Sequence, residues 1–402
     1  MKIPAFTNKI KIGVPAFRFG YYSNLRNIIG LVPDAEYSPL PDLFSMQNRL
    51  ANRLNRLAGR ELFQTFDRNN QFNDLDLNRV DLLHLFNSIS YGRRPWVTTF
   101  ETLVPRFRLA LRPEQMDKGG ETRLRKGLTA LAGKACKKLI ALSKCSLGYE
   151  IDLLKRFPDY RQQITNKMIV LHPGQATLMD KYEDKPVSPP GKVRFMFVGA
   201  AFFRKGGREC VDVLKTLREA HGFDLELVLV SSFKVEDYAT RESPEDVRRY
   251  QAIVQENADW IRHYPSLPNL QVLEWMKNSH VGLLPTHADS YGYSVLEFQS
   301  AGCPVISTDV RALAEINNDR TGWLIRVPKD RLGEARYASA EQRQALSGSI
   351  RTGLEQAVRE IFNDPDSIRR KGELSIERIS LEHSPADRTR RLCEIYTEAM
   401  NA

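Results

Sequence analysis

Short apolar runs alternate with stretches of helical periodicity along most of the chain, which is typical of a parallel α/β architecture. In the first half, the apolar runs predict strands near residues 10–14, 80–86, 96–100, 138–143 and 167–171. In the second half, they predict strands near residues 194–199, 225–231, 261–264, 281–285, 305–308 and 323–327. The pattern therefore predicts two successive α/β series, each forming a doubly wound sheet.

Helical periodicity is clearest in the second half of the chain. It predicts helices near residues 207–220, 244–257, 270–278 and 292–301, and a helical tail from about residue 340 onward. Between the two series, the stretch DKYEDKPVSPPGK is charged and proline-rich without apolar periodicity, as is typical of a linker. We therefore expect an organisation in four parts: a first domain over 1–179, a linker over 180–192, a second domain over 193–365, and C-terminal helices over 366–402 that can cross back to the first domain.

The length of 402 residues agrees with two domains, because a single hydrophobic core rarely serves more than about 250–300 residues. Doubly wound sheets bind ligands at the carboxyl ends of their strands. The cleft between the two domains is therefore the expected ligand site.

Residues 281–309 (VGLLPTHADSYGYSVLEFQSAGCPVISTD) predict a strand, a polar loop, a helix and a second strand. The helix is expected to begin near Gly292, where free N–H groups and the positive end of the helix dipole favour a phosphate. Asp289 and Glu297 lie near this helix start, and carboxylates are suited to accept hydrogen bonds from sugar hydroxyls. The alternative is that Asp289 or Ser290 only caps the helix and that Glu297 lies on a solvated face.

Residues 195–207 (FMFVGAAFFRKGG) predict a buried strand, a glycine turn and the start of another helix. Arg204 and Lys205 follow the strand, and two adjacent cations at the end of a parallel strand can hold a diphosphate. The stretch is not a P-loop, because no Ser or Thr follows Lys205 in the required arrangement.

Together these motifs resemble those of glycosyltransferase family 4, the retaining glycosyltransferases of the GT-B fold (glycosyl transferases group 1). The family's E-x7-E element is matched by DSYGYSVLE, from Asp289 to Glu297, and its FVG strand with a following Arg or Lys is matched by residues 197–205. The continuation AGCPVISTDVRALAEI and the later DRTGWLI also match. The resemblance extends over about residues 192–327 and is fainter before it. It implies two Rossmann-like domains facing each other across a cleft.

The resemblance also implies roles for these residues. Arg204 and Lys205 would neutralise the diphosphate of a nucleotide-sugar. Glu297 would accept hydrogen bonds from the ribose, and Asp289 would hold hydroxyls of the donor sugar. Gly20, in the loop after the first strand, would add a backbone contact. The other expected donor contacts are Gly199, Ser231, Tyr264, Ser290, Tyr291, Gly292, Tyr293 and Ser294.

Three positions depart from the family's pattern. The first acidic position is normally Glu, and Asp289 is one methylene shorter. Ala200 replaces the arginine that follows FVG, and Arg204 can supply that charge. In the stretch WVTTFET, Glu101 occupies the place where many members have a histidine. Its carboxylate could bind hydroxyls or stabilise positive charge in an oxocarbenium-like transition state, and the alternative is an ordinary loop glutamate.

The resemblance implies retention of anomeric configuration and no metal or other cofactor, with a UDP- or GDP-sugar as the co-substrate. The DxD sequence of residues 74–76, a metal-binding motif in transferases of another fold, lies in the polar stretch NNQFNDLDLN, which predicts a turn or a solvated loop. The five cysteines are scattered without a CxxC pair, so we expect neither a disulfide framework nor a zinc site.

Composition, with 42% hydrophobic and 27% charged residues, favours a soluble globular protein. The chain starts without a secretion signal and has no apolar run of about 20 residues, so a cytoplasmic location is expected. The net charge of +10 arises entirely in the first half: residues 1–190 have 30 basic and 18 acidic side chains, and residues 191–402 have 29 and 31. Either this charge belongs to a generally solubilising surface, or the first half meets an anionic partner: a membrane surface, a nucleic acid or an acidic substrate.

Residues 49–60 interleave four arginines with Leu50, Leu54 and Leu57, which predicts a basic amphipathic helix. Either this helix packs its leucines into the domain, or it docks on an anionic membrane surface that presents a lipid-linked or polyanionic acceptor. A second basic stretch runs over residues 123–144. Nucleic-acid binding is not expected, because no aromatic platforms are interleaved with the basic residues.

We therefore predict a glycosyltransferase that acts on a glycan, glycolipid or polysaccharide acceptor, in the cytoplasm or at the inner face of the membrane. The first alternative is a non-catalytic GT-B protein that binds a nucleotide-sugar or a glycan, supported by Ala200 and Asp289. The second is a nucleic-acid-binding α/β protein, supported only by the basic charge.

Overall fold

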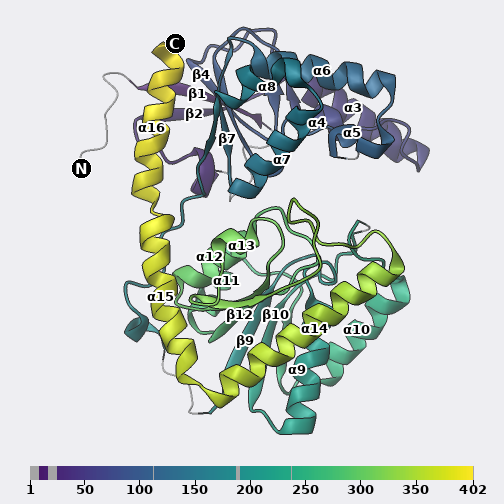
Figure 1. Cartoon of the computed structure of the whole chain (residues 1–402), viewed down its shortest axis with the longest axis vertical. Coiled ribbons are helices and arrows are strands. Elements are labelled where there is room, and N and C mark those ends of the chain that lie inside the picture. The colour runs from purple at the N-terminus through teal and green to yellow at the C-terminus, as the bar shows by residue number, and fades with distance from the viewer. Residues whose placement is uncertain (1–8, 17–24, 112, 187–190, 237, 402) are drawn as a thin grey trace. The chain divides into compact units, whose positions relative to one another are not determined.

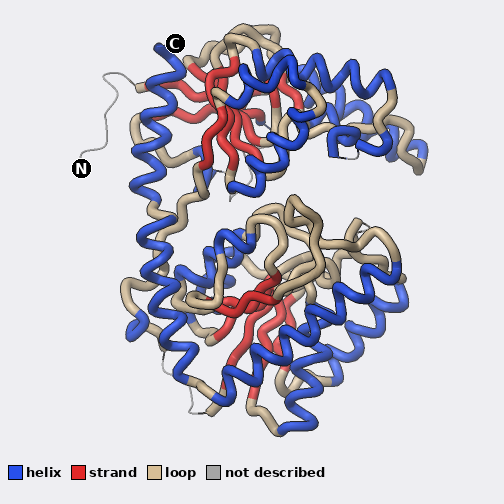
Figure 2. Tube along the Cα trace, viewed as in Figure 1, coloured by secondary structure: helices blue, strands red, loops and turns tan. Residues whose placement is uncertain are grey.

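The computed structural model describes residues 9–16, 25–111, 113–186, 191–236 and 238–401. The chain forms two compact units (Figure 1): Met1–Gly174 with Ser384–Ala402, and Gln175–His383. Each unit combines a parallel sheet with helices (Figure 2), so the predicted α/β fold class is confirmed.

The first unit is built on a parallel sheet of order β2-β1-β4-β6-β7-β8 in the described part of the chain. Its strands are β1 (Ile10–Pro15), β2 (Ala35–Leu40), β4 (Leu82–Phe86), β6 (Trp96–Phe100), β7 (Cys136–Ala141) and β8 (Met168–Val170). Every residue of β4 and β6 is buried, as expected for central strands of a parallel sheet with both faces covered. A separate parallel pair consists of β3 (Gln71–Phe72) and β5 (Ile89–Ser90).

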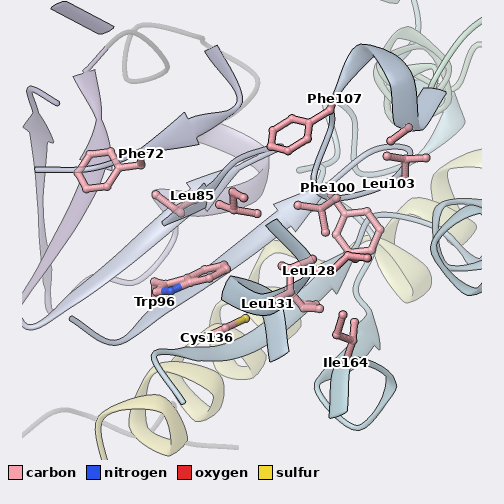
Figure 3. Close-up of a cluster of buried hydrophobic side chains, with 14 of the residues drawn as sticks. Phe72, Leu85, Trp96, Phe100, Leu103, Phe107, Leu128, Leu131, Cys136 and Ile164 are labelled. Carbon is pink, nitrogen blue, oxygen red and sulfur yellow. The ribbon is translucent and has the colours of Figure 1, made fainter. Parts of the chain in front are cut away.

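The helices of the first unit lie between these strands in sequence, apart from the last one. They are η1 (Leu25–Ile29), α3 (Leu43–Ala58), α4 (Phe66–Asn69), α5 (Arg108–Leu111), η2 (Pro113–Gln115), α6 (Lys118–Ala132), α7 (Lys144–Lys155), α8 (Pro158–Thr165) and α16 (Pro385–Asn401). Figure 3 shows a buried cluster in which Trp96 and Phe100 of β6 pack with Leu128 and Leu131 of α6. The helix α6 thus covers the sheet with the leucines that recur along its buried face.

The second unit is built on a parallel sheet of order β11-β10-β9-β12-β13-β14. Its strands are β9 (Val193–Val198), β10 (Leu225–Val230), β11 (Ile261–Tyr264), β12 (Val281–Leu284), β13 (Val305–Thr308) and β14 (Gly322–Ile325). Its helices are η3 (Tyr182–Asp184), α9 (Gly207–His221), α10 (Pro244–Glu256), α11 (Asn269–Lys277), α12 (Tyr293–Ser300), α13 (Leu313–Ile316), α14 (Ala340–Asn363) and α15 (Asp366–Glu382). The strand order reverses between β9 and β12, which makes their carboxyl ends the switch point where such sheets bind ligands.

The C-terminal helices are divided between the two units. The helix α15 belongs to the second unit and α16 to the first, where Arg388 donates hydrogen bonds to the carbonyl oxygens of Ile28 and Leu171. The chain is not helical throughout this tail, because breaks near Pro365 and Ser384 separate α14, α15 and α16.

The exposure of the leucines in α3 contradicts one of the two interpretations of the basic helix. The interpretation in which they pack inward is wrong: Leu50 and Leu57 are 61% and 77% exposed, and the buried residues of α3 are Asn48 and Ala51. The buried face of α3 carries Ala51 and Asn48 instead, and Asn48 donates to the side-chain oxygen of Asn69 of α4 at 2.6 Å.

All five cysteines are free thiols, as their spacing predicted. In the described part of the chain, no helix combines the length and the apolarity that crossing a membrane requires.

Candidate functional site

Two loops meet at the switch point of the second unit. One loop leaves β9 and leads to α9, and the other leaves β12 and leads to α12. The backbone N–H of His287 and the hydroxyl of Thr286 both donate to the carbonyl oxygen of Arg204, at 2.8 and 3.0 Å. Gly206 has a φ of +84°, and a Cβ placed there would lie 2.1 Å from the carbonyl oxygen of Pro285. The close approach of the loops therefore requires glycine at this position.

Both helices begin with a glycine in the left-handed conformation. Gly206 precedes α9, and Gly292, with a φ of +92°, precedes α12. In the regions that the structure describes, neither helix start receives a capping hydrogen bond from a side chain. The N–H of Gly207 donates to the carbonyl oxygen of Phe202 at 2.8 Å, and that of Val295 to the carbonyl oxygen of Gly292 at 2.9 Å, so part of each first turn is already paired. The positive ends of the two helix dipoles still favour an anion at these neighbouring strand ends.

The interpretation of Asp289 or Ser290 as the cap of α12 is wrong, because the cap is Gly292. One carboxylate oxygen of Asp289 instead accepts from the backbone N–H of Tyr291 at 3.4 Å, two residues further along the loop. Asp289 therefore stabilises the loop before α12 and does not cap the helix.

Lys205 and Asp289 form an ion pair between the two loops, with side chains 18% and 10% exposed. Burial by itself raises the pKa of the Asp289 carboxyl, but the charge and hydrogen bond of Lys205, with a smaller effect of Arg204, hold that pKa below its usual value. Asp289 is therefore a buried carboxylate that keeps its negative charge.

Arg204 is also held by neighbours. Its guanidinium pairs with Glu236, donates to the carbonyl oxygen of Ala288 at 2.6 Å, and lies 5.5 Å from the ring centre of Tyr238. Burial lowers the pKa of Arg204, but Tyr238 and the nearby carboxylates raise it overall. Arg204 therefore joins the Asp289 loop to the segment after β10. An incoming diphosphate would compete with Asp289 and Glu236 for the two cations.

Glu297 lies on the first turns of α12, four residues after Tyr293, and is half-buried. Residues four apart share a helix face, so Glu297 and Tyr293 lie on the same side of α12. The ring of Tyr293 lies 5.1 Å from that of the fully buried Tyr291. Ser290 and Ser294 are partly exposed on either side of the helix start.

Three further predicted contacts, Gly199, Ser231 and Tyr264, lie at the ends of β9, β10 and β11. Ser231 is 1% exposed; its N–H donates to the carbonyl oxygen of Tyr264 at 3.0 Å, and its hydroxyl oxygen accepts from the N–H of Phe233 at 3.3 Å. Tyr264 is half-buried against Trp275. A Cβ at Gly199 would lie 3.0 Å from Cγ of Lys205, so glycine leaves room for the lysine.

Glu101 belongs to the first unit, directly after β6. Its N–H donates to the side-chain oxygen of Asn87 at 3.0 Å, and the amide of Asn87 donates back to the carboxylate at 3.5 Å. Ser146 of α7 donates to the carbonyl oxygen of Glu101 at 2.6 Å, which fixes the loop from the other side. Glu101 is thus held at the carboxyl edge of its sheet. Gly20 lies outside the described residues.

The sequence did not indicate Glu236 or Glu209. Glu209 is a fully buried carboxylate on α9, and it accepts from Ser347 of α14 at 2.6 Å and lies 3.2 Å from Nε2 of His287. Burial raises its pKa, but His287 and Arg208 lower it to about 2 overall. An acidic residue at the third position of an expected helix was the one signal that could have pointed to it.

No group of three or more His, Cys, Asp or Glu residues suited to a metal occurs where the structure describes the chain. The DxD sequence forms a turn, as predicted: Asp74 accepts from the N–H of Asp76 at 3.1 Å, and Asp76 accepts from the N–H of Arg93 at 2.9 Å.

Residues 192–338 match the family described as Glycosyl transferases group 1, which confirms the predicted resemblance over that segment. The chain is 27% identical over 139 residues to D-inositol 3-phosphate glycosyltransferase of Paenarthrobacter aurescens, covering 34% of this chain and 32% of that protein. It is 32% identical over 69 residues to a protein of the same name from Streptomyces scabiei, covering 17% of this chain and 16% of that protein. The matches thus span a third or less of the length of these relatives.

Solved structures are similar over nearly the whole chain. WaaG, a glycosyltransferase involved in lipopolysaccharide biosynthesis, aligns with a TM-score of 0.57 and 16% identity, over 94% of this chain and 98% of that chain. Alr3699/HepE from Anabaena in complex with UDP and glucose aligns with a TM-score of 0.55 and 13% identity, over 96% of this chain and 99% of that chain. The chain therefore has the GT-B fold that the sequence predicted.

Proposed function

We propose that the protein is a glycosyltransferase that moves a sugar from a nucleotide-sugar to a glycan, glycolipid or polysaccharide acceptor. The observation that supports this best is the meeting of two uncapped helix starts, α9 and α12, beside Arg204 and Lys205 at neighbouring strand ends. This arrangement suits the diphosphate of a nucleotide-sugar, because helix N-termini and paired cations both stabilise phosphate charge.

The reaction proposed here needs the negative charge of the leaving nucleoside diphosphate to be stabilised as the glycosidic bond to the donor breaks. Lys205, Arg204 and the N–H groups of the two helix starts provide that stabilisation. We propose that transfer retains the anomeric configuration and proceeds without a metal, as the resemblance implies. The proposed donor is a UDP- or GDP-sugar, and the UDP and glucose bound by Alr3699/HepE favour UDP.

The ion pair between Lys205 and Asp289 gives donor binding a specific first step. The diphosphate draws Lys205 toward its own charge, which releases the Asp289 carboxylate to accept hydrogen bonds from donor-sugar hydroxyls. Glu297, one turn into α12, accepts from the ribose hydroxyls. Glu101 of the first unit acts on the acceptor or on the sugar as positive charge develops at its anomeric carbon.

We propose that the first unit docks on an anionic membrane surface that presents the acceptor. Leu50, Leu54 and Leu57 project from α3 without being buried, and exposed arginines lie between them. A helix of this kind inserts apolar side chains at the lipid interface while its basic residues contact anionic headgroups. A lipid-linked or polyanionic glycan at that surface would then be within the reach of the first unit.

A second candidate is a binding protein without transfer activity. The specific observation in its favour is that both Lys205 and Arg204 are paired with carboxylates, Asp289 and Glu236. Incubation with UDP-glucose and with GDP-mannose distinguishes the two. A glycosyltransferase slowly releases UDP or GDP by transferring the sugar to water, and the release falls to background in Lys205→Met. A pure binding protein leaves both donors intact.

A further inference from the structure

A second pocket lies in the second unit, lined mainly by helices behind the loops that hold Lys205 and Asp289. Its volume is about 760 Å³, and its walls come from α9, α10, α14 and the segment at residues 240–242. The three helices lie together in Figure 1. This volume is within the usual range of roughly 300–1,000 Å³ for small-molecule sites.

Arginine dominates the lining of this pocket. Five arginines from four segments face it: Arg208, Arg241, Arg249, Arg343 and Arg351. Arg351 is paired with Asp212 at 2.5 Å, and Arg208 with Glu209 at 3.2 Å. The remaining three form no close ion pair among the described residues.

Two of the remaining arginines make neutral contacts, and Arg249 is partly balanced by Asp246: the hydrogen bonds of Ser243 lower the pKa of Asp246, and the charges of Arg208 and Arg249 lower it further. Arg343 donates to the carbonyl oxygens of Tyr337 and Ala338 at 3.0 and 3.1 Å, and Arg249 lies over the ring of Tyr250. Carbonyl oxygens and aromatic rings orient a guanidinium without neutralising it.

The acidic residues that line the pocket form hydrogen bonds with other groups or are partly buried. Asp212 accepts from Tyr250 as well as from Arg351, and Asp246 accepts from the N–H and the hydroxyl of Ser243 at the start of α10. Glu242 is a partly buried side chain whose pKa is raised above its usual value by burial. The pocket therefore keeps an excess of positive charge.

His287 forms part of the pocket wall and is 1% exposed. Its Nε2 lies 3.2 Å from Glu209, and its Nδ1 has no hydrogen-bond partner in the described part of the chain. A buried ring nitrogen without a partner is costly unless a ligand or water completes it. His287 also lies two residues before Asp289, so the wall of this pocket continues directly into the loop of the first site.

We infer that this pocket binds a small molecule with two or more phosphate groups, held by Arg241, Arg249 and Arg343. Guanidinium groups on separate elements can each take a phosphate oxygen pair, and arginine matches phosphate geometry better than lysine does. The site is distinct from the one that holds Lys205, because none of the pocket's lining residues belongs to that ion pair.

The test is titration calorimetry of the full chain with inorganic pyrophosphate. All proteins contain Lys205→Met, which removes one of the two cations of the first site and weakens pyrophosphate binding there. We expect Lys205→Met to bind pyrophosphate, and the further changes Arg241→Gln and Arg249→Gln to weaken binding by at least about tenfold. Both arginines are exposed and make no ion pair among the described residues, so their loss should leave the fold intact.

The matched control replaces two exposed arginines outside the pocket, Arg248→Gln and Arg320→Gln, in the same Lys205→Met protein. It removes the same charge and should bind pyrophosphate as Lys205→Met does. Parallel titrations with ATP and with glucose 6-phosphate show whether a nucleotide or a sugar phosphate is the better ligand. The inference is overturned if Lys205→Met is folded and does not bind pyrophosphate, or if both double variants bind it equally well.

Discussion

Lys205 and Asp289 form a buried ion pair that joins the loop after β9 to the loop after β12. The two residues are 84 positions apart in the chain, and the pair closes the point where the strand order of the second unit reverses. It keeps the Asp289 carboxylate charged inside the site, with a pKa below its usual value.

Lys205→Met should destabilise the second unit, because it leaves the Asp289 carboxylate buried without its main partner. We expect a loss of about 2–4 kcal/mol in the free energy of unfolding, measured by urea denaturation at pH 7. The double variant Lys205→Met with Asp289→Asn removes the stranded charge and should recover part of that loss. Equal stability of Lys205→Met and the wild type would show that the pair contributes nothing to the fold.

Gly206→Ala should separate the two loops. A Cβ at residue 206 would meet the carbonyl oxygen of Pro285, a backbone atom that cannot turn aside, and the φ of +84° is unfavourable for alanine. Gly222→Ala is the matched control, since Gly222 has a φ of +66° at the other end of α9 and nothing lies near its Cβ position. Thermal denaturation should show a cost of about 1 kcal/mol for Gly222→Ala and a clearly larger one for Gly206→Ala. Equal costs would mean that the loops do not depend on this close approach.

Glu150 should make the stability of the first unit depend on pH. It is a buried side chain of α7 that accepts from the N–H of Val104 at 2.8 Å, and burial raises its pKa from 4.5 to about 8. The folded chain therefore holds a proton that the unfolded chain releases. The contribution of Glu150 to the free energy of unfolding is therefore complete below about pH 4.5 and is lost as the pH rises through about 8.

Glu150→Gln keeps an oxygen that can accept from Val104 and cannot ionise. We expect its melting temperature to match that of the wild type near pH 5 and to exceed it near pH 9, as followed by circular dichroism. Glu114→Gln, at an exposed position, should show no such difference. If the melting temperatures of the wild type and of Glu150→Gln change in parallel between pH 5 and pH 9, Glu150 is not the source of the pH dependence.

The exposed leucines of α3 should be required for membrane binding. Sedimentation with vesicles of phosphatidylglycerol and phosphatidylcholine should recover the wild type at about 0.1 M salt, and pure phosphatidylcholine should recover much less. Asparagine at Leu50, Leu54 and Leu57 should reduce binding by about tenfold or more.

The control for this experiment replaces two other exposed leucines, Leu270→Asn and Leu381→Asn, which are 78% and 72% exposed in the second unit. These changes should leave binding unaffected. Recovery of the α3 variant at the wild-type level would assign the exposed leucines another role.

The strands were predictable where their residues form near-continuous apolar runs. The predicted bounds of β11 and β13 agree with the structure, and the other strands of the second sheet were found within two residues at either end. β2 was not predicted, because AEYSPL contains polar residues and Pro39, which an edge strand tolerates. The sequence pattern also could not predict that the leucines of α3 are exposed, because an amphipathic pattern does not show which face of a helix a neighbouring element covers.

The site was predictable as far as its motifs are local. The spacing of Asp289 and Glu297 and the position of Lys205 after a strand placed all three at one end of the second sheet. Which groups pair was not predictable. The partners of Arg204 and Lys205 lie 32 and 84 positions away, and the sheet order alone brings them together. The arginine pocket likewise combines residues from separate helices that no sequence spacing connects.

The most direct test of the proposed function is calorimetric titration of the wild type, Glu297→Gln and the exposed control Glu377→Gln with UDP and with GDP. We expect one of these nucleotides to bind the wild type and the control with equal affinity. We expect Glu297→Gln to bind that nucleotide at least about tenfold more weakly, because the carboxylate proposed to accept from the ribose is lost. If neither nucleotide binds the wild type, or if Glu297→Gln binds as tightly as the control, the assignment of this site to a nucleotide-sugar is wrong.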